Sequence, residues 1–251
     1  MVKECTVRVL GPVDVLSPDG PQSVGGPQAR AVLATLVIGV GHAVAVDFLH
    51  RTLWGDHPPD SANNTLQSYI SDLRHLLGSA AIKRVDHAYE LDIDSQNIDA
   101  VRFETLLGQA IAAKDDPEQC LRLGRAALRL WRGRPFGDLA DDEPFRLEAF
   151  RLDELRLATM ELSIEADLVL GNHELVVSEL EVAIEEHPYR EHLWYLLIEA
   201  LAGHGRRVEA LRACRRLRTV LAEVGVQATD ELRLIEQQIL EGHPISSHTS
   251  S

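Results

Sequence analysis

Neutral hydrogen-bonding side chains near residue 70 recur at the spacing of a single helix face. If residues 62–77 form a helix, the face opposite its apolar stripe carries Asn64, Gln67, Ser68, Ser71, Arg74 and His75. Amides pair bidentately with adenine edges, hydroxyls donate or accept, and Arg reaches guanine or phosphate. The free N–H groups at the start of such a helix also bind phosphate. This face is suited to the major groove of DNA, and an ordinary solvated face is the alternative.

Two adjacent cations, Lys83 and Arg84, follow this segment. On the arm of a hairpin they would clamp phosphates or enter the minor groove. The alternative is a solvated edge strand, in which lysine protects against aggregation.

The charge of the chain is concentrated unevenly. Residues 61–84 hold three Lys and Arg against one acid, Asp72, a net charge of +2. The whole chain holds 25 Lys and Arg against 39 Asp and Glu, a net charge of −14. Counterion release scales with the phosphates that are neutralised, so a monomer with so few cations is expected to bind DNA weakly. A dimer or a protein partner on DNA is then needed.

The elements that position these residues follow a recognisable order. Alternating runs over 6–10 and 13–16 flank a Ser-Pro-Asp-Gly turn and predict a small β-meander. Helices are expected over 27–40 and from about residue 46, and Pro58-Pro59 ends the second. Ser61 is the expected N-cap of the third helix, Ala62 to Leu77, and Gly78 its stop. A hairpin over 82–91 completes the plan of a winged helix-turn-helix.

The second half of the chain reads as helical throughout. The expected helices span 99–113, 117–132, 145–170, 173–186, 190–203, 206–224 and 229–241. Ile164-Glu165-Ala166 recurs as Ile198-Glu199-Ala200, and Gly171 as Gly205, both 34 residues later, which is the tetratricopeptide period. Chance agreement is the alternative, but the alternation of helix and short turn favours stacked helical hairpins.

These patterns predict a mainly α chain with small β elements. Residues 1–95 are expected to form the winged helix-turn-helix, 96–241 an all-α tetratricopeptide-like domain, and 242–251 a disordered tail. The longest apolar run, residues 31–40, is well short of the roughly 18 residues that cross a bilayer. Cys5, Cys120 and Cys214 are scattered and fit no disulfide framework. A cytoplasmic protein without membrane contact is expected.

Motifs of the common enzyme classes are missing from the sequence. It contains no Walker A loop, no G-x-S-x-G elbow and no zincin histidine pair. We therefore expect no enzyme, no cofactor and no metal site. Asp141-Asp142-Glu143 is read as an exposed loop.

Two further features leave alternatives open. Trp131 is either a partner anchor or, the favoured interpretation, core or interdomain packing; Trp194 and Tyr195 are also expected in the core. A dense basic set is either a second phosphate contact or, slightly favoured, a solvated helix paired with Glu209 and Glu223; the set is Arg206, Arg207, Arg212, Arg215, Arg216 and Arg218.

Several blocks of the sequence resemble one known family. The first half contains Val9-Leu10-Gly11-Pro12, Gly25-Gly26-Pro27-Gln28-Ala29-Arg30, Leu53-Trp54-Gly55-Asp56 and Asn63-Asn64-Thr65-Leu66-Gln67-Ser68-Tyr69-Ile70. The second half contains Leu130-Trp131-Arg132-Gly133, Arg151-Leu152-Asp153-Glu154, His187-Pro188-Tyr189-Arg190 and Gly205-Arg206-Arg207-Val208. In order and spacing, over about residues 5–241, they are similar to the Streptomyces antibiotic regulatory proteins.

The resemblance implies an OmpR-type winged helix followed by a bacterial transcriptional activation domain. It implies an activator of biosynthetic gene clusters that binds direct repeats in promoters, recruits RNA polymerase holoenzyme and forms a homodimer at least on DNA, at the nucleoid. The implied DNA contacts add two residues: Asn63, Asn64, Thr65, Gln67, Ser68, Ser71, Arg74, Lys83 and Arg84. Asn63 lies closest to the helix N-terminus and is expected to touch phosphate rather than a base.

The sequence departs from the family pattern at two places. Asp72 and His75 flank Arg74, where the family has more basic residues, and residues 224–232 lack the usual Glu-Pro-Gly. The ATPase and sensor extensions of larger members are not in this chain, so regulation by nucleotide is not expected within it. Two functions remain: a sequence-specific transcription activator, and an adaptor that binds proteins through its tetratricopeptide-like domain with little DNA affinity.

Overall fold

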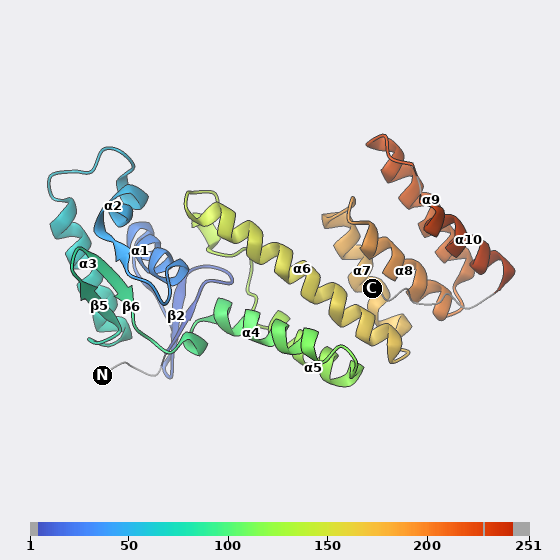
Figure 1. The fold of residues 1–251 in the computed structure, drawn as a ribbon, viewed down its shortest axis with the longest axis horizontal. Helices are drawn as coiled ribbons and strands as arrows, with labels where there is room; N and C mark the ends of the chain where they lie inside the picture. Colours follow the sequence, from blue (N-terminus) through green and yellow to red (C-terminus); the bar gives the residue numbers. More distant parts are fainter. Residues whose placement is uncertain (1–4, 228, 243–251) are drawn as a thin grey trace. The chain divides into compact units, whose positions relative to one another are not determined.

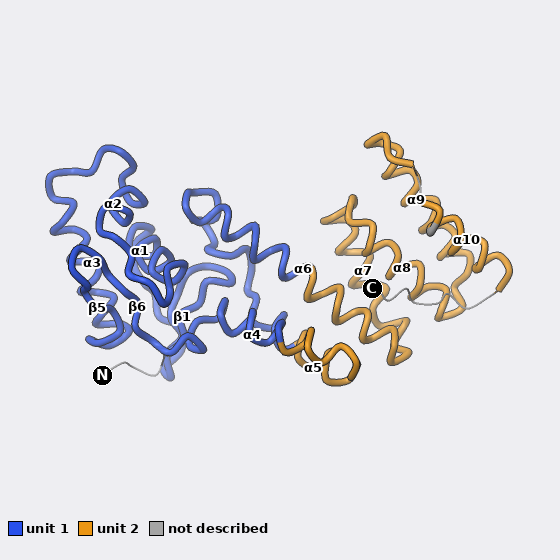
Figure 2. Tube along the Cα trace, viewed as in Figure 1, with its two compact units in different colours: residues 1–108, 126–157 blue, residues 109–125, 158–251 orange. Residues whose placement is uncertain are grey.

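The computed structural model describes residues 5–227 and 229–242. Its contacts divide the chain into two compact units (Figure 2). The first contains residues up to 108 together with 126–157, and the second contains 109–125 and the chain from 158 on. The chain thus crosses between the units more than once, and residues 96–108 and 126–157 pack with the N-terminal part. Of the tail expected at 242–251, residues 243–251 lie outside the described part.

The first unit begins with a small antiparallel sheet of order β1-β2-β3, formed by Thr6–Arg8, Asp14–Ser17 and Gly20–Gln22. Val7 opposite Val15 sets the register, and both side chains are fully buried. The alternation seen in the sequence therefore places one face of this sheet in the core.

Three helices and a second sheet follow in the expected order (Figure 1). The helices are α1 (Pro27–Ile38), α2 (Val46–Trp54) and α3 (Ala62–Leu77). The sheet has the order β4-β6-β5, with β4 at Val44–Ala45, β5 at Ile82–Val85 and β6 at Ala88–Leu91. The amide of Val46 donates to the carbonyl of His87 at 2.9 Å, which joins the start of α2 to the hairpin turn. This is a winged helix-turn-helix.

Helix α3 is set in place by a buried stripe and a hydrogen bond. Its buried side chains are Ala62, Leu66, Ile70, Leu73 and Leu77, spaced at helical intervals. At its flank, the Tyr69 hydroxyl donates to Gln28 Oε1 of α1 at 2.7 Å. Ser61 is the N-cap residue, as expected, but no helix amide donates to its hydroxyl. The Ser61 carbonyl instead accepts from the Thr65 amide at 2.9 Å.

A buried carboxylate joins the first sheet to the start of α4 (Asp99–Ala112). Asp99 Oδ1 accepts from the amide of Val9 at 2.8 Å, and Oδ2 accepts from that of Leu10 at 3.1 Å. The short 3₁₀ turn Ser95–Asn97 leads into α4, and Ile98 forms a parallel bridge with Val7. Only 2% of Asp99 is exposed, and Arg132 Nη2 lies 3.8 Å from Oδ2.

The same two residues of the first sheet bond to a later loop. The amide of Arg132 donates to the Leu10 carbonyl at 2.8 Å, and the amide of Phe136 donates to that of Val9 at 2.7 Å. The backbone N–H and C=O groups of both Val9 and Leu10 are thereby hydrogen-bonded in the core. This explains why α5 (Pro117–Leu128) ends four residues before the expected boundary at 132: the following backbone is bonded to the sheet.

Glycine is required at one place in this contact. A Cβ on Gly11 would stand 3.0 Å from Cβ of Arg132, and its φ of +151° is one that L side chains rarely adopt. Gly137, at the start of the 3₁₀ turn Gly137–Leu139, similarly lies against Pro12. The glycine in the Leu10-Gly11-Pro12 block thus allows the loop to approach the sheet.

The second unit is built from antiparallel helices. Its helices after α5 are the second half of α6 (Phe145–Val169), then α7 (His173–Glu186), α8 (Glu191–Gly203), α9 (Arg207–Glu223) and α10 (Asp230–Glu241). Each packs on the next along the chain from α7 to α10. Positive-φ Gly171 and Gly205 stand in equivalent turns of two successive hairpins. The all-α, tetratricopeptide-like arrangement is confirmed.

The core of this unit contains charged groups that are bonded internally. Glu161 accepts from Nε and Nη2 of Arg190, both at 2.9 Å, and Asp167 pairs with Arg125 at 3.0 Å. Trp194 is buried, and its Nε1 donates to the Pro188 carbonyl at 2.9 Å, as a core residue should. Tyr195 was also expected in the core but is only half-buried, and its hydroxyl lies 2.8 Å from Oγ1 of Thr229.

In the first unit, Trp131 makes a packing contact. Its ring meets Phe103 edge-on at 5.3 Å, and the Arg156 guanidinium lies 5.1 Å from its centroid. This is the favoured of the two interpretations given above. Among the described residues, no helix combines the length and the apolar composition that crossing a membrane requires.

Asp99 predicts a specific dependence of stability on pH. Burial is the main cause that raises its pKa from 3.8 to about 6, against the hydrogen bonds from Val9 and Leu10. A raised folded-state pKa means that its contribution is fully present below pH 3.8 and is lost as pH rises through 6. At about 1.4 kcal/mol per pKa unit, the loss is on the order of 3 kcal/mol.

The measurement is urea unfolding followed by tryptophan fluorescence between pH 4 and pH 7. The free energy of unfolding of the wild type should fall across this window relative to that of Asp99→Asn, whose side chain does not ionise. Parallel pH profiles for the two proteins would contradict the prediction.

Candidate nucleic-acid interface

Helix α3 presents its neutral polar side chains together on its outer face. Those exposed to solvent are Asn63, Asn64, Gln67, Ser68 and Ser71, and Thr65 at the edge is half-buried. They alternate with the buried stripe along the helix, so the inward and outward faces are separated cleanly. Asp72 and His75 complete the exposed face toward its C-terminal end. Six of the nine predicted contacts therefore lie on one continuous helix surface.

Arg74 is placed differently from the other predicted contacts. Its Nε and Nη2 both donate to the carbonyl oxygen of Ile82, at 2.9 Å and 2.7 Å, and the side chain is half-buried. Ile82 is the first residue of β5 and is itself buried. Arg74 thus attaches α3 to the hairpin. The sequence predicted Arg74 as a DNA contact because it lies on the polar side of the helix and Arg reaches guanine or phosphate. Nothing in the sequence between Arg74 and Ile82 indicates that the two residues bond.

The hairpin carries the remaining two predicted contacts, Lys83 and Arg84, on its edge strand β5. The Lys83 ammonium lies 2.5 Å from Oδ2 of Asp92, and this hydrogen bond is the main cause that raises the pKa of Lys83. The guanidinium of Arg84 stands 5.7 Å from the ring centroid of Tyr89 across the hairpin, within cation–π range. Both side chains are exposed, and both already have intramolecular contacts that orient them.

The electrostatic setting of the face is acidic. Residues 5–98 hold 6 Lys and Arg against 10 Asp and Glu, a net charge of −4. The +2 of residues 61–84 is therefore a local excess, and Asp92 lies beside it. A polyanion would be attracted by the cations of the helix and hairpin and repelled by the acids around them. Each charge acts over about 8 Å, the Debye length at physiological salt.

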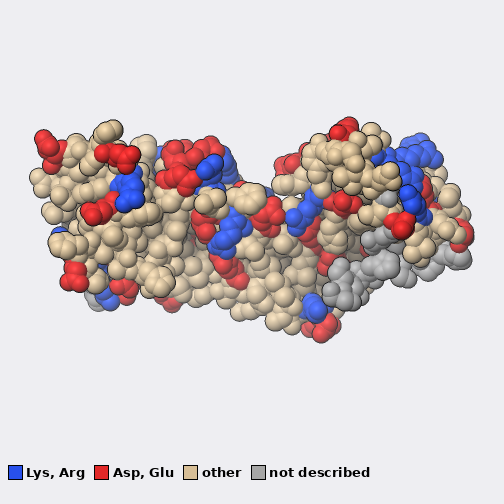
Figure 3. Space-filling view, turned by 45° about the horizontal axis from the view of Figure 1, so that its top comes forward, with Lys and Arg blue, Asp and Glu red and all other residues tan. Residues whose placement is uncertain are grey.

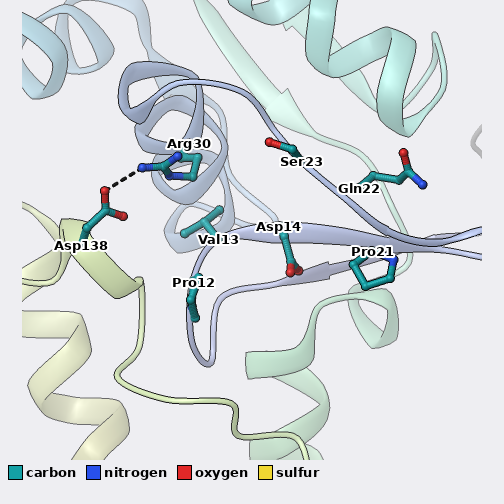
Figure 4. Close-up of a pocket in the computed structure, with 8 residues that line it drawn as sticks. All are labelled: Pro12, Val13, Asp14, Pro21, Gln22, Ser23, Arg30 and Asp138. Carbon is teal, nitrogen blue, oxygen red and sulfur yellow. Dashed lines mark hydrogen bonds and ion pairs between the residues drawn. The ribbon is translucent and has the colours of Figure 1, made fainter.

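A separate depression of about 480 Å³ lies on the first unit (Figure 4). It is lined by Pro12, Val13, Asp14, Pro21, Gln22, Ser23, Arg30 and Asp138. Its charged groups bond to one another or to neighbours: Arg30 pairs with Asp138 at 2.6 Å, and Asp14 pairs with Arg8 at 2.7 Å. The first pair links the loop after α5 to α1, and the second lies within the first sheet.

The comparisons with known proteins find transcriptional regulators along the chain. The model of the bacterial transcriptional activator domain matches residues 98–240. The transcriptional regulatory protein EmbR of Mycobacterium tuberculosis is 38% identical over 99% of this chain and 66% of its own length. The regulatory protein DnrI of Streptomyces peucetius is 34% identical over 86% of this chain and 84% of its own.

The structural comparison gives the same relationship. The structure of Mycobacterium tuberculosis EmbR in complex with a low affinity phosphopeptide aligns with a TM-score of 0.89 at 36% identity. The alignment covers 97% of this chain and 67% of that one. By sequence, the chain spans slightly less than two thirds of the length of EmbR. Since the activator-domain model covers more than half of the chain and these regulators align with most of it, the chain belongs to the Streptomyces antibiotic regulatory protein family of transcriptional regulators.

Proposed function

We propose that the chain is a sequence-specific DNA-binding activator of transcription that reads the major groove with α3. The observation that carries this proposal is the exposed face of α3. Five residues with uncharged amides or hydroxyls lie together on it: Asn63, Asn64, Gln67, Ser68 and Ser71. Such groups supply the donors and acceptors that distinguish base pairs, while charge alone would not discriminate. The hairpin would then place Lys83 and Arg84 at the neighbouring phosphates or minor groove.

The charge balance supports binding as more than one copy. With a net charge of −4 over residues 5–98, one winged helix gains little from counterion release. Two copies on adjacent half-sites would double the specific contacts. Copies in head-to-tail order match direct repeats, and copies related by a two-fold axis match inverted ones. We propose a homodimer on direct repeats in promoters, following the family.

The regulatory step is proposed from the family as well. The activator would recruit RNA polymerase holoenzyme at a secondary-metabolite gene cluster, at the nucleoid. The second candidate is a protein-interaction adaptor, favoured by the stacked hairpins from α6 to α10. Salt-dependent DNA affinity separates the two, because an adaptor needs none.

Gln67 tests the reading of bases. Selection of random duplexes by the full chain should enrich a direct repeat with about one helical turn between half-sites. Gln67→Ala should then weaken binding to the selected site by about 1–3 kcal/mol, since one bidentate base contact is lost. Gln109→Ala, an exposed glutamine of α4, is the matched control and should bind normally. Unchanged affinity of the Gln67 variant, with circular dichroism intact, would contradict the assignment of α3.

Arg74 tests attachment of the hairpin. Because its guanidinium holds the Ile82 carbonyl, Arg74→Ala should speed hydrogen exchange of the β5 amides in the free protein and also weaken DNA binding. If Arg74 served only as a phosphate contact, exchange without DNA would be unchanged and only the salt dependence would fall, by about one phosphate.

Asp92 tests the position of the hairpin on DNA. Asp92→Asn removes the carboxylate that pairs with Lys83 and lies beside the proposed interface. DNA affinity should rise, and the slope of log affinity against log salt should steepen by about 0.9, one phosphate. Asp19→Asn, at the exposed turn after β2, makes the same charge change away from the interface. Equal effects of the two variants would mean that Lys83 does not reach DNA.

A further inference from the structure

Helix α9 is the most basic segment of an acidic unit. The described residues 109–125 and 158–242, with residue 228 uncharged, hold 11 Lys and Arg against 19 Asp and Glu, a net charge of −8. Six of those cations fall within residues 206–218, together with one acid, Glu209. Figure 3 shows Lys and Arg side chains gathered at the upper right of the view, where α9 lies.

Four of the six arginines are held by groups of their own unit. Arg206 pairs with Glu209 at 2.6 Å, and Arg218 pairs with Glu236 of α10. Arg207 donates to the carbonyls of Ile239 and Leu240, at the C-terminal end of α10. Arg216 pairs with Glu181 of α7 at 2.9 Å and lies 5.0 Å from the ring centroid of Trp194. The contacts of Arg207, Arg216 and Arg218 connect α9 to its neighbouring helices, and the Arg206 pair lies at the start of α9 itself.

Arg212 and Arg215 have no such role. Both side chains are exposed. Within the described part of the chain, neither guanidinium makes a hydrogen bond or an ion pair, and the Arg215 carbonyl accepts only from its own helix, from the Thr219 hydroxyl at 3.1 Å. Both project opposite the buried face of α9, which is formed by Ala210, Ala213, Cys214, Leu217 and Leu221. Two acids near α9 are bonded to other arginines: Glu181 pairs with Arg216, and Glu209 pairs with Arg206 and attracts Arg212 only through space.

The two arginines lie on the outermost line of the helix, between an apolar and a polar residue. This line, the arginine stripe, consists of Val208, Arg212, Arg215 and Thr219. Val208 is 65% exposed. At 1.5 Å per residue the stripe is roughly 16 Å long. Exposed arginines beside an apolar side chain are typical of protein interfaces, where Arg is enriched.

We propose that the arginine stripe binds an acidic segment of a partner protein. Each guanidinium can bind a carboxylate with two parallel hydrogen bonds. The spacing of Arg212 and Arg215, one helical turn apart, accepts two carboxylates of a short segment, and Val208 accepts an apolar side chain at one end. This inference does not rest on DNA binding by α3, because α9 belongs to the other compact unit.

Charge favours a protein segment over a nucleic acid at this place. A short peptide within about 8 Å of the stripe interacts mainly with Arg212 and Arg215, because salt screens more distant charges. A duplex is longer than the stripe and would run past it onto a unit whose net charge is −8. Glu223, exposed at the end of α9, would be among the first groups to repel it.

The test is fluorescence anisotropy of a labelled five-residue peptide of Glu, Asp and Leu, whose extended length of roughly 17 Å matches the stripe, titrated with the full chain. The same peptide with Gln and Asn in place of the acids is the reference probe. The acidic peptide should bind, with an affinity that falls as salt rises, and the neutral peptide should not. The double variant Arg212→Glu/Arg215→Glu should lose at least tenfold in affinity.

A matched control separates the stripe from general repulsion. Arg122→Glu/Arg233→Glu makes the same change in net charge at two exposed arginines of the same unit. It should retain the affinity of the wild type. Arg212→Gln/Arg215→Gln should also lose binding, and its melting temperature should match that of the wild type because both side chains are exposed.

Three results would overturn the proposal. One is the absence of binding by the acidic peptide at low salt. Another is an equal loss in the stripe variant and the control variant. The third concerns a DNA duplex that lacks the site selected by the chain. If the wild type and the control variant bind this duplex and the stripe variant does not, the stripe is a DNA contact.

Discussion

The carboxylate of Asp99 is the contact on which the first unit depends. It accepts the amides of Val9 and Leu10, whose carbonyls are bonded by the amides of Phe136 and Arg132. Three stretches of sequence separated by about 90 and 35 residues thus meet at two peptide units. Removing any of these partners would leave a buried backbone group unsatisfied, at a cost of roughly 1–3 kcal/mol. The winged helix therefore shares its core with the residues that follow it.

The local elements could be predicted from the sequence because their signals are local. Helix α3 begins at Ala62 and ends at Leu77 as its apolar spacing and Gly78 indicate, and the hairpin follows from β-propensity around a turn. The exposed polar face of α3 follows from the same periodicity. These features need only neighbours within a few turns of chain.

The contacts between distant segments could not be predicted, because no periodicity encodes them. Asp99 reads in the sequence as an ordinary first-turn acid of a helix, and Arg74 as one more cation on an exposed face. Their partners, the amides of Val9 and Leu10 and the carbonyl of Ile82, are backbone groups with no side-chain signature. The end of α5 at Leu128 could not be predicted for the same reason, because the backbone that follows it bonds to the first sheet, from the Arg132 amide to the Leu10 carbonyl.

Two hydrogen-bonded contacts, from Tyr69 to Gln28 and from Arg74 to Ile82, attach helix α3 to α1 and to β5. The position of the helix is therefore set by contacts that do not involve its outer face. Ordering costs on binding are then confined to the exposed rotamers, at roughly 0.5–1.5 kcal/mol for each rotamer-rich side chain. Ser and Asn have few rotamers, so they lose little conformational entropy when they bind. A face built from them is preorganised, and a larger part of the free energy of each contact remains as binding affinity.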